Sequence, residues 1–219
     1  MTTARAFAFF TCLLAAQVGS AGDSDERAVA AIKKWGGIAT RDAKIKGNPV
    51  VGVNLVYSKI DDGVLAEFAG LAYLQELELF GTKITDDGLK KLRDLPSLAT
   101  LDLGFTRISD AGLKELGGFK KLHTLNLRDT NVTGTGLKDL RHLPNLTTLY
   151  LNGAALSDEK WQGVKELGSL QTLNVHGTHI TSFEPLRELK NLQMLDALRT
   201  KVNDPRLAAV RDLKNLKFL

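Results

Sequence analysis

The stretch LATLDLGFTRISDAGLKELGGF, residues 98–119, decides the fold of this chain. Leu101 and Leu103 are two residues apart, as on a half-buried strand, whereas Leu113 and Leu116 are three residues apart, as on one face of a helix. The stretch therefore predicts a short strand followed by a short helix. A unit of this size cannot bury a core by itself, so it must pack against other copies.

The same pattern returns along the chain with a spacing of 24 residues, shortened once to 22. The first leucine of each predicted strand recurs at Leu77, Leu101, Leu125, Leu149, Leu173, Leu195 and Leu219. A row of threonines follows the strands at Thr82, Thr106, Thr130, Thr178 and Thr200, and Ala154 takes this place in one copy. A more divergent first copy starts at Val50. A fixed period of about 20 to 29 residues indicates a solenoid.

Written as LxxLxLxxTxI(T/S)DxGLxxL, the repeat resembles the leucine-rich-repeat family over residues 50–219, with about seven copies and an incomplete eighth at residues 214–219. The likeness is closest to the cysteine-free repeats of bacterial exported proteins and weaker to those of ribonuclease inhibitor. It implies an α/β fold, a right-handed solenoid arc with a parallel concave sheet and convex helices. Threonine stands where most of the family has asparagine, and its hydroxyl replaces part of that hydrogen bonding. Ala154 has no hydroxyl, so we expect a weak point there.

Residues 1–21, MTTARAFAFFTCLLAAQVGSA, have the layout of a secretory signal peptide. They contain one basic residue, no acidic residue, an apolar run and small residues at the end. An uncleaved membrane anchor is the alternative, but the apolar run is shorter than the roughly 20 residues that a span requires. Cys12 is the one cysteine of the chain, so cleavage leaves a mature protein without disulfides.

Residues 22–49 are predicted to form a cap over the first repeat. Residues 23–37 read as an amphipathic helix that buries Val29, Ile32 and Trp35 and ends at the glycines that follow. A short extended segment then leads into the repeats, which occupy residues 50–219.

The charge pattern and the motifs argue against several functions. The chain has 29 basic and 25 acidic residues, a balance too mild and too evenly spread to favour nucleic-acid or membrane binding. No nucleophile elbow, zinc-protease motif or glycine-rich phosphate loop is present in the sequence. Glu78 and Asp102 would be neighbours on an open sheet, and His176 and His179 have no carboxylate fixed beside them. We therefore predict a non-enzymatic protein without a metal or another cofactor.

The outward-facing strand positions are varied where the buried positions are uniform, as expected of a recognition surface. The candidate ligand-binding residues are the aromatic Tyr57, Phe80 and Phe105, followed by a polar group made of Arg128, Tyr150, Asn174 and His176. The alternative is that these are ordinary solvated positions, because scattered exposed aromatic residues are common.

The sequence thus favours a secreted, periplasmic or cell-envelope binding module that recognises a protein or peptide, or a glycan, through its concave sheet. A second hypothesis is a structural component of the cell envelope that assembles through an exposed C-terminal edge strand. A third is an intracellular regulator resembling the repeat part of F-box receptors, which would require that the N-terminus is not cleaved.

Overall fold

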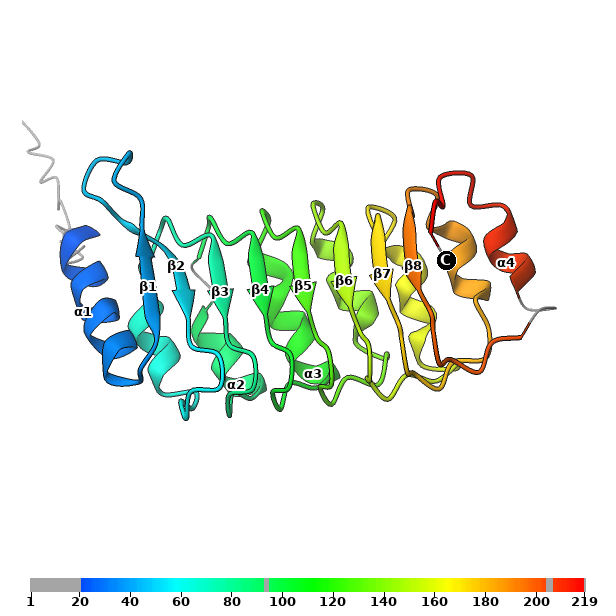
Figure 1. The fold of residues 1–219 in the computed structure, drawn as a ribbon, viewed down its shortest axis with the longest axis horizontal. Coiled ribbons are helices and arrows are strands. Elements are labelled where there is room, and N and C mark those ends of the chain that lie inside the picture. The colour runs from blue at the N-terminus through cyan, green and yellow to red at the C-terminus, as the bar shows by residue number, and fades with distance from the viewer. Residues whose placement is uncertain (1–20, 93–94, 204–206, 219) are drawn as a thin grey trace, which may run out of the picture.

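The computed structural model describes residues 21–92, 95–203 and 207–218. The predicted signal peptide therefore lies outside the described residues except for Ala21, as does Leu219 at the end of the predicted eighth repeat. In the described part, strands lie side by side in one sheet and helical turns cover its opposite side, as Figure 1 shows. The predicted α/β solenoid is confirmed. No helix in these ranges is long and apolar enough to cross a membrane.

Within the described ranges the sheet has eight strands, which follow one another in chain order. They are β1 (Ile38–Arg41), β2 (Val50–Asn54), β3 (Glu76–Glu78), β4 (Thr100–Asp102), β5 (Thr124–Asn126), β6 (Thr148–Tyr150), β7 (Thr172–Asn174) and β8 (Met194–Asp196). Neighbours from β2 to β8 are parallel and in register, so that Leu77 lies beside Leu101 and Leu101 beside Leu125. The extended segment of the cap forms β1, which pairs with β2 in the antiparallel direction.

The helical elements opposite the sheet are short, and most are 3₁₀ helices, labelled η. They are η1 (Val64–Phe68), α2 (Asp86–Leu89), η2 (Lys90–Leu92), α3 (Asp110–Leu113), η3 (Lys114–Gly118), η4 (Leu137–His142), η5 (Trp161–Glu166), η6 (Glu184–Glu188) and α4 (Ala208–Arg211). The longer α1 (Ala21–Lys34) belongs to the cap at the N-terminal end of the solenoid. A 3₁₀ helix is tighter than an α-helix, which suits coils whose strands lie only about 4.8 Å apart.

One continuous core runs through the solenoid, and the leucine row from Leu77 to Leu195 is buried in it. Four threonines of the row are buried as well, and Thr200 is half-buried. The hydroxyl of Thr106 donates a hydrogen bond of 2.6 Å to the carbonyl of Leu103, and the same bond occurs at Thr82, Thr130 and Thr178. Each hydroxyl therefore satisfies a carbonyl of its own coil. Ala154 is buried in the same row without a hydroxyl, so the weak point expected there stays a prediction.

A row of aspartates joins one coil to the next. The carboxylate of Asp86 accepts hydrogen bonds from the N–H of Ser109 at 2.9 Å and from its hydroxyl at 2.6 Å. Asp62 and Asp158 accept the equivalent pairs of bonds from the following coils. A Cβ atom at Gly112 would lie 2.3 Å from Oδ1 of Asp86. The glycine of the repeat consensus therefore makes room for the carboxylate of the preceding coil.

Asp110 accepts more of these bonds than the other aspartates. Its donors are the hydroxyl and N–H of Thr133 and the N–H groups of Gly134 and Gly136. Burial by itself would raise the pKa of the Asp110 carboxyl, but the hydrogen bonds outweigh burial and hold the pKa below its ordinary value. The ionised carboxylate is therefore the form that joins these coils.

The cap packs on the first coil as expected in most respects. Val29 and Ile32 are buried, and the buried carboxylate of Asp25 accepts a 2.7 Å hydrogen bond from the N–H of Val50 at the start of β2. The expected burial of Trp35 is wrong, because this residue is 37% exposed. Helix α1 ends at Lys34, one residue before Trp35, and the chain turns at Gly36, where φ is +73°. Trp35 therefore does not belong to the buried face of the helix.

We expect Asp110→Ala to lower the free energy of unfolding at pH 7 by about 1–3 kcal/mol, because it leaves several partly buried donors without an acceptor. The wild-type contribution is complete above the unfolded-state pKa of about 3.9 and is lost as the pH falls through the lower folded-state pKa. Urea unfolding of both proteins should therefore show a smaller stability difference at pH 3 than at pH 7. Glu159→Gln, at an exposed position, serves as the control. An equal difference at both pH values would contradict this role.

Candidate functional site

Three aromatic rings from consecutive coils touch one another where the strands β2, β3 and β4 end. The rings of Tyr57 and Phe80 meet edge to face, with centroids 5.4 Å apart and planes at 87°. The rings of Phe80 and Phe105 have centroids 5.7 Å apart and are tilted by 39°. Tyr57 is 71% exposed and Phe105 56% exposed, whereas Phe80 between them is half-buried. We call these three residues the aromatic patch.

Glycines of the following coil provide the space for two of these rings. A Cβ atom at Gly81 would lie 2.5 Å from the ring of Tyr57, and one at Gly104 would lie 2.6 Å from the ring of Phe80. Each glycine stands one repeat after the aromatic residue that lies on it. Any larger residue at these two positions would displace a ring, so the glycines determine how flat the rings lie on the sheet.

The two residues of the aromatic patch with exposed rings have an unfavourable backbone conformation. Tyr57 and Phe105 both have a φ of +56°, in the left-handed region. The equivalent position is glycine in three other coils, at Gly81, Gly153 and Gly177, all with positive φ. A bulky residue there costs about 1–2 kcal/mol relative to the ordinary conformation, and glycine avoids that cost. Two large aromatic side chains are thus kept at positions where glycine would be the more stable choice, which points to a use for them.

Arg128 and Tyr150 lie in the middle of the sheet face, and the structure does not bring them into one cluster with the aromatic patch. The Nε atom of Arg128 donates to Asp129 at 2.9 Å, and this ion pair is partly exposed. Tyr150 is half-buried at the end of β6, between Asn126 on β5 and Asn174 on β7.

Asn174 and His176 belong to a second cluster with Asp196 of the next coil. Oδ1 of Asn174 accepts from the N–H of His176 at 2.9 Å, and its Nδ2 donates to Asp196 at 2.9 Å. Nδ1 of His176 lies 3.8 Å from Oδ1 of Asp196. Both polar atoms of the Asn174 amide thus have partners within the protein.

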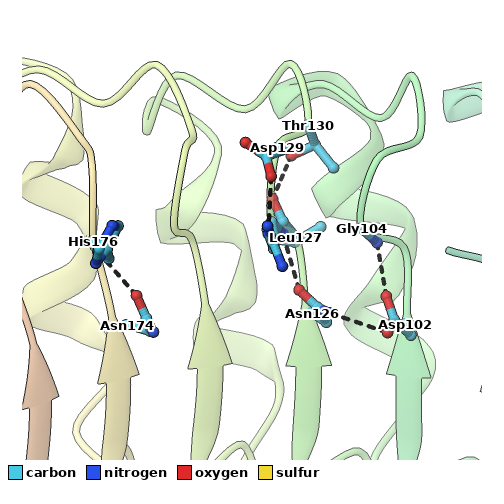
Figure 2. A network of polar contacts seen from close by, with 9 residues as sticks. Asp102, Gly104, Asn126, Leu127, Asp129, Thr130, Asn174 and His176 are labelled. Atoms are coloured by element: carbon cyan, nitrogen blue, oxygen red, sulfur yellow. Dashed lines mark hydrogen bonds and ion pairs between the residues drawn. The ribbon is translucent and has the colours of Figure 1, made fainter. Parts of the chain in front are cut away.

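A related arrangement occurs two coils earlier, where the asparagine amide donates to the preceding coil instead of the following one. Figure 2 shows it together with the bond between Asn174 and His176. Asp102 accepts from the N–H of Gly104 at 2.8 Å and from the side-chain amide of Asn126 at 3.0 Å, while Asn126 in turn accepts from the N–H of Arg128. Asn54 likewise donates to Glu78. These asparagine and acidic side chains therefore accept hydrogen bonds from N–H groups just after the strands and join neighbouring coils.

Glu78 and Asp102 are not arranged as a catalytic acid–base pair. Glu78 and Asp102 lie side by side, but their carboxylates accept hydrogen bonds from asparagine amides on an open sheet. Within the described ranges, no group of three histidine, cysteine, aspartate or glutamate side chains is placed to hold a metal ion.

Sequence reasoning missed several parts of this site. Ile38 on β1 and Val56 after β2 add exposed apolar surface next to the aromatic patch, and Asp196 is the shared acceptor of the second cluster. The glycines beneath the rings left a readable signal, since each follows an aromatic residue by 24 positions. No comparable signal marks Ile38, because its position depends on the antiparallel pairing of β1.

We expect Phe105→Gly to be more stable than Phe105→Ala, which is the reverse of the usual order. Both variants lose the contact with Phe80, worth about 0.5–1.5 kcal/mol, but only glycine removes the left-handed strain. The glycine variant should unfold in urea within about 1 kcal/mol of the wild type, whereas the core control Leu101→Ala should lose about 2–5 kcal/mol. A less stable glycine variant would show that the backbone at this position is not strained.

Three consecutive coils match the family model described as Leucine Rich repeat, at residues 70–92, 94–117 and 120–140. No curated protein matches the chain. Among solved structures, the chain is similar to an internalin C2 from Listeria monocytogenes str. 4b F2365, with 19% sequence identity and a TM-score of 0.57. The likeness covers 89% of this chain and 92% of the internalin.

Two longer proteins share the fold over part of their length. The structure of PEPR1-AtPEP1 has a TM-score of 0.55 and 20% identity, over 90% of this chain and 34% of that one. A TDR receptor has a TM-score of 0.53 and 20% identity, over 70% of this chain and 27% of that one. At sequence identities this low, the similarities show a shared fold alone. The family model thus identifies leucine-rich repeats at residues 70–92, 94–117 and 120–140, and the solved structures share the solenoid fold with the chain around them.

Proposed function

We propose that this chain is an exported, non-enzymatic binding module that recognises a protein or peptide through the aromatic patch on its sheet face. Leucine-rich-repeat proteins typically mediate protein–protein binding, and solenoids offer extended surfaces for it. The observation that carries the proposal is the exposure of the Tyr57 and Phe105 rings on left-handed backbone. Because burial in the core does not account for these rings, contact with a partner is the use that explains them.

The composition of the surface around the aromatic patch supports a protein or peptide ligand. Exposed Ile38 and Val56 extend the patch towards the first strands of the sheet. Aromatic residues are enriched at the centres of protein interfaces, and polar residues form the rim. In this proposal Arg128, Tyr150, Asn174 and His176 line the continuation of the surface along the sheet. A glycan could also stack on exposed rings, and the choice of a peptide probe below distinguishes the two.

Export is supported by the composition of the first 21 residues, with one basic residue followed by an apolar run and small residues. The repeats that follow contain no cysteine, so their stability does not depend on the redox state of the compartment.

Assembly through the C-terminal edge has weaker support. The N–H of Leu195 on β8 donates to the carbonyl of Phe218 at 3.0 Å, and the N–H of Phe218 donates to Gln193. Residues 217–218 thus already occupy part of the outer edge of β8. A partner at this edge would therefore contact the exposed side chains of Met194 and Phe218 instead of pairing with this part of the backbone of β8.

We expect a random peptide library displayed on phage to yield binders to the wild-type chain that are lost on the double variant Phe80→Ala, Phe105→Gly. These substitutions remove two rings of the aromatic patch and leave the core intact. Tyr73→Ala is the matched control, because it removes an exposed ring from the loop before β3, at the opposite end of the strand. Equal recovery of binders from the double variant and the wild type would refute binding through the aromatic patch.

We expect the protein recovered from its producing cell to begin near residue 22, because the signal sequence is removed during export. N-terminal sequencing or intact-mass measurement gives the answer directly. A chain that retains Met1 would favour the intracellular alternative.

A further inference from the structure

A row of basic side chains runs beside the aromatic patch in the same three coils. Lys59, Lys83 and Arg107 stand two residues after Tyr57, Gly81 and Phe105, on the loops that leave the sheet. All three basic side chains are exposed. In the next three coils the same position holds Asn131, Ala155 and His179, and in the last coil it holds Lys201, so the run of three consecutive cations accompanies the aromatic rings. We call Lys59, Lys83 and Arg107 the basic row.

The coils hold these cations close together. The N–H of Lys83 donates to the carbonyl of Ile60 at 3.2 Å, and the N–H of Arg107 donates to Ile84 at 3.0 Å. Backbones paired in this way lie about 4.8 Å apart. Like charges at such spacing repel one another, so the basic row is unfavourable for the isolated protein.

No carboxylate among the residues that the structure describes forms an ion pair with the basic row. In the part of the chain that the structure describes, these three side chains form no hydrogen bond or ion pair, unlike Arg128, which is paired with Asp129. Asp61, two residues after Lys59, accepts a hydrogen bond from the N–H of Gly63. Other aspartates stand three residues after each cation, at Asp62, Asp86 and Asp110. Their carboxylates accept hydrogen bonds from the serine or threonine of the following coil instead.

The opposite side of the aromatic patch carries the opposite charge. Glu78 and Asp102 lie on β3 and β4, at the strand side of the rings, and each is held by an asparagine amide. A ligand with acidic side chains is repelled from these carboxylates and attracted to the basic row. Along the strand direction the surface therefore carries carboxylates first, then aromatic rings and then cations.

We propose that the aromatic patch and the basic row together bind a protein segment that carries acidic side chains next to an aromatic or aliphatic one. This inference rests on the proposed function, because it names the chemistry of the ligand for the same surface. The apolar side chain contacts the rings of Phe80 and Phe105. The acidic side chains contact Lys59, Lys83 and Arg107, whose charges are already in place and lack partners.

The test compares peptides selected from the displayed random library on three proteins. The first is the wild-type chain, and the second carries Lys59→Glu, Lys83→Glu and Arg107→Glu. The third carries Lys114→Glu, Lys138→Glu and Lys165→Glu, which make the same change in net charge on the helical face of the solenoid. Urea unfolding of all three proteins establishes that each is folded.

Wild-type and control proteins should select peptides in which aspartate or glutamate stands next to an aromatic or aliphatic residue. The triple variant of the basic row should bind the same synthetic peptides at least about tenfold more weakly, since reversed charges at an interface are costly. Raising the salt concentration from 0.05 to 0.5 M should weaken wild-type binding, because salt screens the attraction, and should strengthen the residual binding of the variant, because salt screens the repulsion.

Three results would overturn this inference. Peptides that need Phe80 and Phe105 but show no acidic preference, or that bind the basic-row variant equally well, would leave the proposed function standing and remove the acidic ligand. A library that yields no binder to the wild-type chain would remove both. A preference for basic peptides would assign ligand recognition to Glu78 and Asp102 instead.

Discussion

The contact between one coil and the next is the constraint on which the rest of this structure depends. A coil contributes a strand of three residues and a helical turn, and neither persists without neighbours. Strand pairing, the buried leucine row and the aspartate bonds all connect equivalent positions of successive coils. The outward-facing positions take no part in the core, so they can differ from coil to coil while the framework stays the same.

The outward-facing residues differ between the first coils and the later coils of the sheet. In the first coils, left-handed positions carry Tyr57 and Phe105, and the loops beside them carry the basic row. In later coils the left-handed positions hold Asp129, Gly153, Gly177 and Arg199, of which Asp129 is paired with Arg128. The loop positions there hold Asn131, Ala155, His179 and Lys201. The N-terminal half of the sheet face therefore combines exposed rings with unpaired charge, while polar groups in the other half bond mainly to one another. A rigid solenoid makes this arrangement a preformed surface, which lowers the entropic cost of binding.

The contacts of the two groups of candidate residues could be predicted from the sequence to different degrees. The contact of Tyr57, Phe80 and Phe105 could be anticipated, because parallel in-register coils place residues about 24 positions apart side by side. The polar group could not be anticipated as a set. Short side chains such as Asn174 reach either a ligand or the neighbouring N–H, and only the local geometry decides between them. Whether either group binds a ligand stays a prediction.

The sequence by itself determined the repeat, the register of the leucine and threonine rows, and the order of the strands, because buried positions repeat with a fixed period. Tertiary structure alone decided which loop positions become left-handed, where β1 joins the sheet, and how the aspartates bond to the next coil. It also placed Trp35 outside the buried face of α1. These features arise where backbone turns and side chains of different coils meet, and hydrophobic periodicity carries no information about such meetings.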